Sequence, residues 1–321
     1  MMNVPKLEDL GERKAVESLI RLLGPAGTPV GVGDDCAVLD FLQDLVLLTT
    51  DMIHEKTHLP SGFTPYLAGW YAAAVNLSDI AAMGGEPLAL LAAVSLPREK
   101  EENFLLEIMR GMKECGALYN VSVIGGDTKE SDLLVIAATA VGRASKGAIL
   151  LRSGAKAGDV VCLTGTVGRA AVHLERSQEG HSENVEPLLR IYPRITEGRL
   201  LSENQWGNSA IDLSDGLALS LHQLARASRV GFEIEGSKVP LFRREGESYQ
   251  EALQRGLYTG GDFELLFTMG TEHLLAAQEG FRAKGTSFTV IGSVLSEPAL
   301  LVKIDAETIP LEEKGWEHFK E

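Results

Sequence analysis

Apolar residues recur along the first 145 positions with spacings that predict alternating helices and strands. Six apolar residues between 6 and 23 follow helical spacing and predict an amphipathic helix that ends near Gly24 and Pro25. A second helix is predicted from Thr64, as N-cap, and Pro65 to Gly84-Gly85, and its nearly continuous apolar surface predicts burial. The pattern also predicts a helix at 99–119 and strands at 45–50, 88–96, 121–124 (ending in a GGDT loop) and 133–141.

The composition shifts toward Gly, Ser, Lys and Arg around residues 142–158, where we place a domain boundary that gives domains 1–145 and 146–321. The second half begins with a strand at 159–164, followed by a GTVG turn and a helix. A strand at 209–212 then leads through Ser214 into a helix that ends near 228. Further strands are predicted near 231–235, 263–268, 287–294 and 299–303. Both halves are therefore predicted to be α/β or α+β units, with mixed sheets and flanking helices.

Composition narrows the classes of protein that fit. A chain of 321 residues with 45% hydrophobic content favours two domains with a full core. The net charge of −15 argues against a nucleic-acid partner, because phosphate backbones require clustered Lys and Arg. Cys36, Cys115 and Cys162 lie far apart without a CxxC pair, which is typical of a reduced cytosolic protein. No apolar run has membrane-spanning length, so we expect a cytoplasmic protein with no membrane partner.

Six aspartates follow or interrupt stretches that ought to be buried: Asp35, Asp51, Asp79, Asp127, Asp212 and Asp215. A buried carboxylate is costly unless a positive charge meets it, and no Lys or Arg lies within these short segments. Oxygen ligands of this kind suit Mg²⁺, and Thr49 and Thr50 add hydroxyl or carbonyl oxygens beside Asp51. The sequence therefore predicts a site with several Mg²⁺ ions, as an enzyme that joins two phosphates would need.

Each aspartate also has a simpler interpretation when it is taken alone. Asp35 and Asp127 follow glycines and fit turns, and Asp79 fits a satisfied core hydrogen bond or a partly solvated helix end. Ser214 and Asp215 fit an N-cap box, although such a helix start also attracts phosphate. Repetition of the pattern in five separate segments favours the metal site. The chain has no P-loop and no protein-kinase signature, so an ATP site would depend on metals and scattered donors.

The segment from His54 to His58 reads HEKTH and matches the HExxH pattern of zinc proteases. That chemistry needs a helix that presents both histidines to one ion, whereas this segment follows a strand and runs into Leu-Pro-Ser-Gly. We therefore favour a loop histidine near an anionic substrate. A zinc hydrolase that uses His54, Glu55 and His58 remains as an alternative.

Two further residues have two interpretations each. Trp316 is either an anchor for the C-terminal tail or a flat face for an aromatic or cationic ligand. Arg152 either grips a phosphate or is an ordinary linker arginine.

Taken together, these segments resemble the thiamine-monophosphate kinase family, which belongs to the superfamily of aminoimidazole ribonucleotide synthetase and selenophosphate synthetase. The match runs nearly end to end through GVGDDCAVL, LLTTD, AVNLSDIAAMGGEP, IGGDT, LRSGAKAGD, TGTVG, YPR, AIDLSDGL, GGDFELLFT and KGWEHF. The resemblance implies a two-domain chain that dimerises through its N-terminal sheets. It also implies transfer of the γ-phosphoryl group of ATP to thiamine monophosphate, giving thiamine diphosphate. Another enzyme of the superfamily with a different acceptor, or a non-catalytic nucleotide-binding module, are the alternatives.

The resemblance also implies roles for individual residues. The implied Mg²⁺ ligands are Asp35, Thr49, Thr50, Asp51, Asp79, Asp127, Asp212 and Asp215. The implied ATP contacts are Gly126, Asp127, Arg152 and Ser214, and the implied substrate contacts are His58 and Trp316. The family usually reads GGEDYELLF where this chain has GGDFELLF, so Asp262 either replaces a substrate-contacting Glu or that contact is lost. The expected mechanism is direct in-line transfer without a phosphoenzyme and without a general base, because the acceptor phosphate is largely dianionic near neutral pH.

Overall fold

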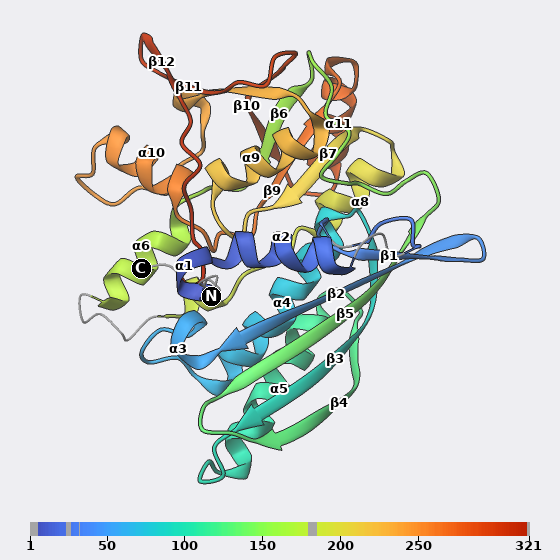
Figure 1. Cartoon of the computed structure of the whole chain (residues 1–321), viewed down its shortest axis with the longest axis vertical. Coiled ribbons are helices and arrows are strands. Elements are labelled where there is room, and N and C mark those ends of the chain that lie inside the picture. The colour runs from blue at the N-terminus through green and yellow to red at the C-terminus, as the bar shows by residue number, and fades with distance from the viewer. Residues whose placement is uncertain (1–5, 24–26, 32, 179–184, 320–321) are drawn as a thin grey trace, which may run out of the picture.

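Two mixed β-sheets organise the computed structural model, which describes residues 6–23, 27–31, 33–178 and 185–319 (Figure 1). The N-terminal sheet has five strands in the order β1-β2-β5-β3-β4, and only the β3–β4 pair is parallel. Its strands are β1 (Ala37–Phe41), β2 (Asp44–His54), β3 (Glu86–Leu96), β4 (Ser122–Glu130) and β5 (Val135–Ser145).

The C-terminal sheet has seven strands in the order β12-β11-β8-β10-β6-β9-β7, in which β11 and β8 are parallel. Its strands are β6 (Val160–Thr164), β7 (Gly207–Asp212), β8 (Gly231–Glu235), β9 (Leu265–Met269), β10 (Phe288–Leu295), β11 (Leu300–Ile304) and β12 (Glu307–Pro310). The predicted α/β class, with mixed sheets and flanking helices, is confirmed.

Helices cover the sheets and connect the two halves. They are α1 (Leu7–Leu10), α2 (Glu12–Leu23), α3 (Glu55–His58), α4 (Pro65–Ala82), α5 (Glu102–Ala117), α6 (Arg169–Gln178), α7 (Glu186–Leu189), α8 (Ile195–Glu203), α9 (Leu217–Ser228), α10 (Tyr249–Tyr258) and α11 (Leu274–Ala283). The predicted first helix is divided at Gly11, and its expected end at Gly24-Pro25 lies outside the described residues. In the described ranges, no helix has the length and apolar character needed to cross a bilayer.

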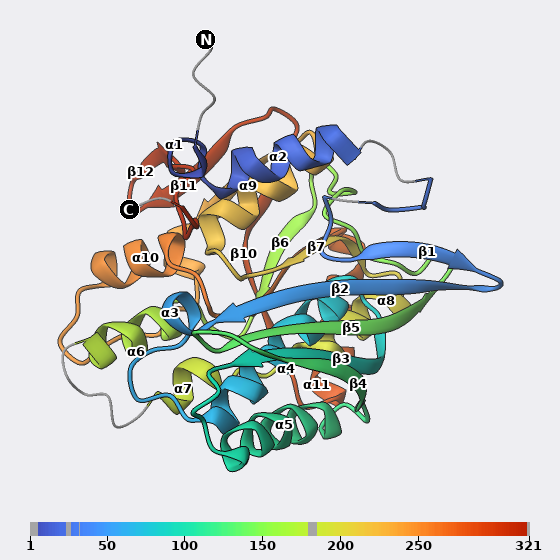
Figure 2. The same cartoon turned by 60° about the horizontal axis from the view of Figure 1, so that its bottom comes forward.

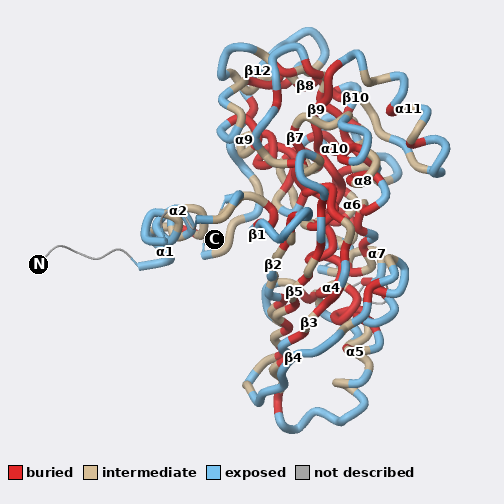
Figure 3. The backbone as a smooth tube through the Cα atoms, turned by 90° about the vertical axis from the view of Figure 1, so that its right-hand side faces the viewer, coloured by how far each residue is buried: buried red, intermediate tan, exposed pale blue. Residues whose placement is uncertain are grey.

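Helix α4 is the central element of the fold. It begins as predicted, because the Thr64 hydroxyl accepts the N–H of Leu67 (3.2 Å) and Pro65 occupies the first turn. Nearly all of its side chains are buried, and it packs against strands of the N-terminal sheet and against α5, α8 and β7. One apolar core includes Leu47 and Phe267 from the two halves, and Figure 3 shows buried backbone running from one sheet to the other.

Strands β2 and β4 extend beyond their predicted ends, and this changes the position of two candidate residues. Asp51 lies within β2, which pairs with β5 as far as His54, and does not follow the strand's end. Asp127 lies within β4 and is paired with Ala93 of β3, so the predicted GGDT loop is wrong. The polar residues of GGDT fit a strand here because β4 is an exposed edge, where neither face has to be apolar.

Helices α4 and α5 lie together on one face of the N-terminal sheet (Figure 2). Their crossing depends on reciprocal glycines. A Cβ atom at Gly69 would lie 1.9 Å from the Ile108 carbonyl oxygen, and one at Gly111 would lie 1.9 Å from the Tyr66 carbonyl oxygen. Only glycine allows two helix backbones to approach so closely.

We expect Gly111→Ala to lower the melting temperature. Ala normally stabilises a helix interior by about 1 kcal/mol relative to Gly. Here the added methyl group must displace α4, at a cost of about 1–3 kcal/mol or more, which reverses the sign. Thermal unfolding followed by circular dichroism measures this, with Gly125→Ala as control because the nearest atom to its new Cβ is 3.9 Å away. A higher melting temperature for Gly111→Ala would contradict the close approach.

Candidate active site

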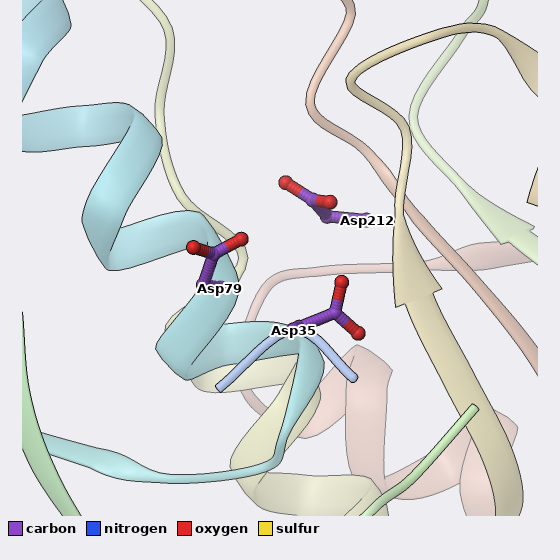
Figure 4. Close-up of side chains that lie close together, drawn as sticks. All are labelled: Asp35, Asp79 and Asp212. Carbon is purple, nitrogen blue, oxygen red and sulfur yellow. The ribbon is translucent and has the colours of Figure 1, made fainter. Parts of the chain in front are cut away.

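Three carboxylates from distant parts of the chain meet where the two halves join. Asp35 lies in the segment before β1, Asp79 on α4, and Asp212 at the end of β7. One oxygen of each lies within 4.8 Å of the others, and Figure 4 shows the three side chains directed toward a common space. The structure therefore brings together three of the predicted metal ligands.

Helix α4 and strand β2 supply the polar groups that orient this cluster. The Thr49 hydroxyl donates to Asp79 Oδ2 (2.5 Å), and the Ser78 hydroxyl donates to Asp212 Oδ2 (2.6 Å). The Asn76 side-chain oxygen accepts the N–H of Asp51 (3.0 Å) and so ties β2 to the helix. The sequence NLSD on a buried helix thus has a physical reason, because each of its polar side chains serves the cluster or an adjacent strand.

The cluster is electrostatically strained. Burial, and then the charges of Asp51, Asp212 and Asp35, raise the pKa of Asp79 well above its usual value. Burial and the charge of Asp35 raise the pKa of Asp212 to about 8, and the same two causes raise the pKa of Asp51. The neighbouring charges therefore disfavour ionisation of Asp51, Asp79 and Asp212, and a cation among them would reverse this effect.

Arg152 is the basic residue that meets the cluster, and the short segments around the aspartates gave no sign of it. Its Nη2 lies 2.7 Å from Asp35 Oδ1, and its backbone N–H donates to both carboxylate oxygens of Asp34 (3.2 Å each). Burial, followed by the charge of Asp35, raises the pKa of Asp34 to about 6. Arg152 is therefore not an ordinary linker arginine, because its side chain already forms an ion pair with Asp35.

Asp35 also provides a test of whether a cation fits. Its side chain is fully buried, yet its Oδ2 has no hydrogen-bond partner among the residues that the structure describes. A buried acceptor without a partner is unusual in a folded protein and points to a ligand. An all-oxygen set of carboxylates and hydroxyls fits a hard divalent cation such as Mg²⁺.

Other predicted ligands on the same elements are placed differently. Thr50 is exposed, its side chain lies on the opposite face of β2 from Thr49 and Asp51, and its hydroxyl donates to the Ala138 carbonyl (2.8 Å). Because the Thr50 side chain lies on the other face of the strand, the backbone carbonyl oxygen is the atom of Thr50 that stays a predicted metal ligand. Asp215 is half-buried just beyond β7, and burial raises its pKa to about 6.

The N-cap interpretation of Ser214 and Asp215 is wrong. Helix α9 begins at Leu217, and its N-cap is Gly216, whose φ of 111° lies in a region that favours glycine. Ser214 is exposed, and its carbonyl accepts the N–H of Gly261 (2.7 Å).

Gly126 and Asp127 lie on the edge strand β4. A Cβ atom at Gly126 would lie 1.9 Å from the Ala92 carbonyl oxygen, so strand packing alone requires glycine there. Asp127 is exposed, and hydrogen bonds from Lys129 and from the N–H of Thr128 lower its pKa. Within one described chain, Asp127 does not group with the cluster of Asp35, Asp79 and Asp212.

The two predicted substrate contacts have a common neighbour that the sequence analysis did not single out. The ring of His318 lies 5.2 Å from that of His58 and 5.6 Å from that of Trp316. Trp316 is 50% exposed, and its backbone N–H donates to the Asp215 carbonyl (3.1 Å). His318 lies in the KGWEHF motif, so the family resemblance of that motif is the sequence feature that points to it, and residue spacing does not.

The structure does not support a zinc site at HEKTH. Helix α3 has four residues, and the Nδ1 atoms of His54 and His58 accept the backbone N–H groups of Lys56 and His54. Glu55 accepts the N–H of Leu134 (2.8 Å). In the described part of the chain, the group of possible ligands close enough to share an ion is Asp35, Asp79 and Asp212.

The geometry gives Asp262 a structural role instead of the predicted substrate contact. Asp262 is buried, and its two oxygens accept the N–H groups of Gly168 (2.6 Å) and Ala170 (2.9 Å). It therefore caps the start of α6, where the helix dipole favours a negative charge. This partner lies more than ninety positions away, so nothing near Asp262 in the sequence announces it.

Comparison with known families agrees with this architecture. The family model described as AIR synthase related protein, N-terminal domain, matches residues 33–144, and its C-terminal counterpart matches residues 156–305. The thiamine-monophosphate kinase of Methanospirillum hungatei is 36% identical over 88% of this chain and 97% of its own length. That of Escherichia coli is 35% identical over 90% of this chain and 92% of its own length.

Solved structures give the same result. A structure described as AaThiL complexed with AMPPCP and TMP has a TM-score of 0.85 and 29% identity, and the alignment covers 98% of this chain and 99% of that one. The hydrogenase maturation protein HypE in complex with ATP has a TM-score of 0.70 at 19% identity over 93% of this chain and 94% of its own, which shows a shared fold alone. Because the relatives match along nearly the whole length, this chain belongs to the thiamine-monophosphate kinase family.

Proposed function

We propose that this protein transfers the γ-phosphoryl group of ATP to thiamine monophosphate at the cluster of Asp35, Asp79 and Asp212. The observation that carries the proposal is the convergence of these three carboxylates from both halves of a chain of this family. In this proposal both domains contribute to the site. Residues 1–145 supply Asp35 and Asp79, and residues 146–321 supply Asp212 and the tail with Trp316.

The cluster would hold divalent cations, and we infer that these are Mg²⁺. Asp35, Asp79 and Asp212 would be the first ligands, Thr49 and Asp51 lie beside them, and Asp215 follows Asp212 by three positions in the chain. When bound, such ions neutralise phosphate oxygens and align donor with acceptor. The orphaned Asp35 Oδ2 and the raised pKa values of Asp79 and Asp212 support this assignment.

The chain's own groups favour direct transfer over a covalent intermediate. The acceptor phosphate is already an anion, so no base has to activate it. Cys36 is buried, and burial raises the pKa of its thiol further above neutrality, so it is no nucleophile.

The remaining assignments give each substrate its own set of contacts. Arg152 and the exposed Ser214 would contact ATP, and His58 and Trp316 would contact the acceptor. The tail supports this arrangement, because the hydrogen bond from Trp316 to Asp215 joins the acceptor side to the cation side.

We further propose that the protein is a homodimer formed through the open face of the N-terminal sheet. Met52 on β2, Leu88 on β3 and Ile124 on β4 are exposed apolar side chains, of the kind that a partner would cover. Gly126 and Asp127 on β4 would then serve the site of the other copy, which accounts for their separation from the cluster. Sedimentation at micromolar concentration tests this, and a monomer would contradict it.

The direct test of function is ADP formation from ATP and Mg²⁺ with thiamine monophosphate as acceptor. We expect ADP release to depend on thiamine monophosphate, with little release with free thiamine or with an aminoimidazole precursor. Equal release with an aminoimidazole precursor would favour another enzyme of the superfamily. ATP binding without any acceptor-dependent release would favour a nucleotide-binding module.

We expect Asp79→Asn to lower turnover at least about 100-fold, because it removes a charged ligand while keeping the shape of the side chain. Its melting temperature without divalent ions should not fall, since the amide removes a carboxylate that its neighbours repel. Steady-state kinetics and thermal unfolding check both parts. Asp132→Asn, at an exposed position, is the control and should leave both values near wild type. Near-normal turnover of Asp79→Asn would refute the ligand assignment.

Trp316→Ala should raise the KM for thiamine monophosphate about tenfold. The indole face would lose its contact with the positive thiazolium ring, which is worth about 1–2 kcal/mol. The KM for ATP should stay within about twofold, because no assigned ATP contact changes. Phe319→Ala provides an aromatic control on the same tail, where the ring is 54% exposed. An equal rise in both KM values for Trp316→Ala would count against the assignment.

A further inference from the structure

The segment 261–264 sets the path of the chain between Asp212 and Asp215. The N–H of Gly261 donates to the Ser214 carbonyl (2.7 Å), and the N–H of Phe263 donates to the Leu213 carbonyl (3.0 Å). In return, the Glu264 carbonyl accepts the N–H of Leu213 (2.9 Å). These bonds continue the pairing of β7 with β9 beyond the last residue of β7.

The side chain of Glu264 fixes this segment to the rest of the molecule. Arg194, directly before α8, donates to it twice, from Nε to Oε2 (2.6 Å) and from Nη2 to Oε1 (2.5 Å). The Thr164 hydroxyl donates to Oε2 (2.7 Å), and the Glu264 side chain is only 7% exposed. The paired bonds of a guanidinium fork define the position and the plane of a carboxylate.

Phe263, between the two anchored acids, has a strained backbone. Its φ of 50° lies in the left-handed region, which a bulky residue rarely adopts. Such a conformation persists when the surroundings hold it on both sides, here Asp262 at the start of α6 and Glu264 at Arg194. The Phe263 ring packs edge-on against Tyr71 of α4 (5.8 Å), the helix that carries Asp79.

We propose that Arg194 and Glu264 are positioning residues for the cation site. Through the backbone of 261–264 they hold Asp212 where one of its carboxylate oxygens lies within 4.8 Å of ligand oxygens of Asp35 and Asp79, close enough for the three to share an ion. A well-packed apolar pair would stabilise the fold as well as this buried ion pair does, whereas the fork also fixes geometry. The inference rests on the proposed cation role of the cluster. It assigns Glu264 to the scaffold of the site and not to a substrate.

The test is Mn²⁺ binding to the full chain without nucleotide, measured by electron paramagnetic resonance well below each variant's melting temperature. Glu264→Gln and Arg194→Lys should each raise the Kd for Mn²⁺ about 10-fold to 100-fold, as is typical when a group that supports a metal ligand is changed. Arg194→Lys keeps the charge but loses the fork, so it should not restore affinity. Thr164→Val, which removes one hydroxyl, should raise the Kd less than the other two variants do.

Arg199→Gln is the matched control. Arg199 lies on α8, the helix that Arg194 precedes, and it donates to the exposed Glu203, so the Kd of this variant should stay within about twofold of wild type. The activity of each variant, measured at saturating and at limiting Mg²⁺, should differ from wild type mainly at limiting Mg²⁺. A purely structural role would lower the melting temperature without this dependence.

Several results would overturn the inference. Folded Glu264→Gln and Arg194→Lys with wild-type Kd for Mn²⁺ would do so, whatever their melting temperatures. If Arg194→Lys does not fold, Glu264→Gln and Thr164→Val decide the question, and unchanged Kd values in both would overturn it. A wild-type chain that binds no Mn²⁺ would overturn it together with the cation role. A chain that binds Mn²⁺ with the expected order of variants but makes no ADP with thiamine monophosphate would support the inference and refute the proposed function.

Discussion

Mutual repulsion among buried carboxylates is the constraint on which the rest of this structure depends. Asp35, Asp79 and Asp212 share a space in which one oxygen of each lies within 4.8 Å of the others, and Arg152 neutralises only part of their charge. Such a group separates unless the surrounding elements hold it together. The buried helix α4 and the apolar core cluster that includes residues of both halves supply that restraint, and the reciprocal glycines at the crossing of α4 and α5 fix where α4 lies.

The same constraint explains why polar side chains occur where an apolar core would be more stable. Ser78 and Asn76 on α4 are fully buried, and each makes a hydrogen bond that orients the cluster or the strand beside it. Glu264 and Arg194 extend this pattern to the segment beyond β7. A protein built only for stability would replace these groups, so their presence marks a site where geometry is held at a cost to stability.

The sequence was informative wherever a residue's role depends on near neighbours. Thr64 and Pro65 mark the start of α4 by local capping chemistry, and Asp79 is conspicuous because the helix around it is apolar. The sequence did not reveal contacts between residues that lie far apart along the chain. The fork between Arg194 and Glu264 joins positions seventy residues apart, and Asp262 caps a helix more than ninety residues before it. The full length of β4 was missed because polar side chains on an exposed edge strand resemble a turn.

The position of Asp262 bears on how this chain would recognise its acceptor. The segment GGDFELLF, which contains Asp262, is one acidic residue shorter than the family pattern that it resembles. Both carboxylate oxygens of Asp262 accept N–H groups at the start of α6. Glu264, the next acid, is held by Arg194 and Thr164. Neither carboxylate is therefore free to meet a positively charged ring. The exposed indole of Trp316, beside His318, offers an electron-rich face. Under the proposed assignment of Trp316, selectivity for a thiamine acceptor would therefore depend on the C-terminal tail more than on these two acids.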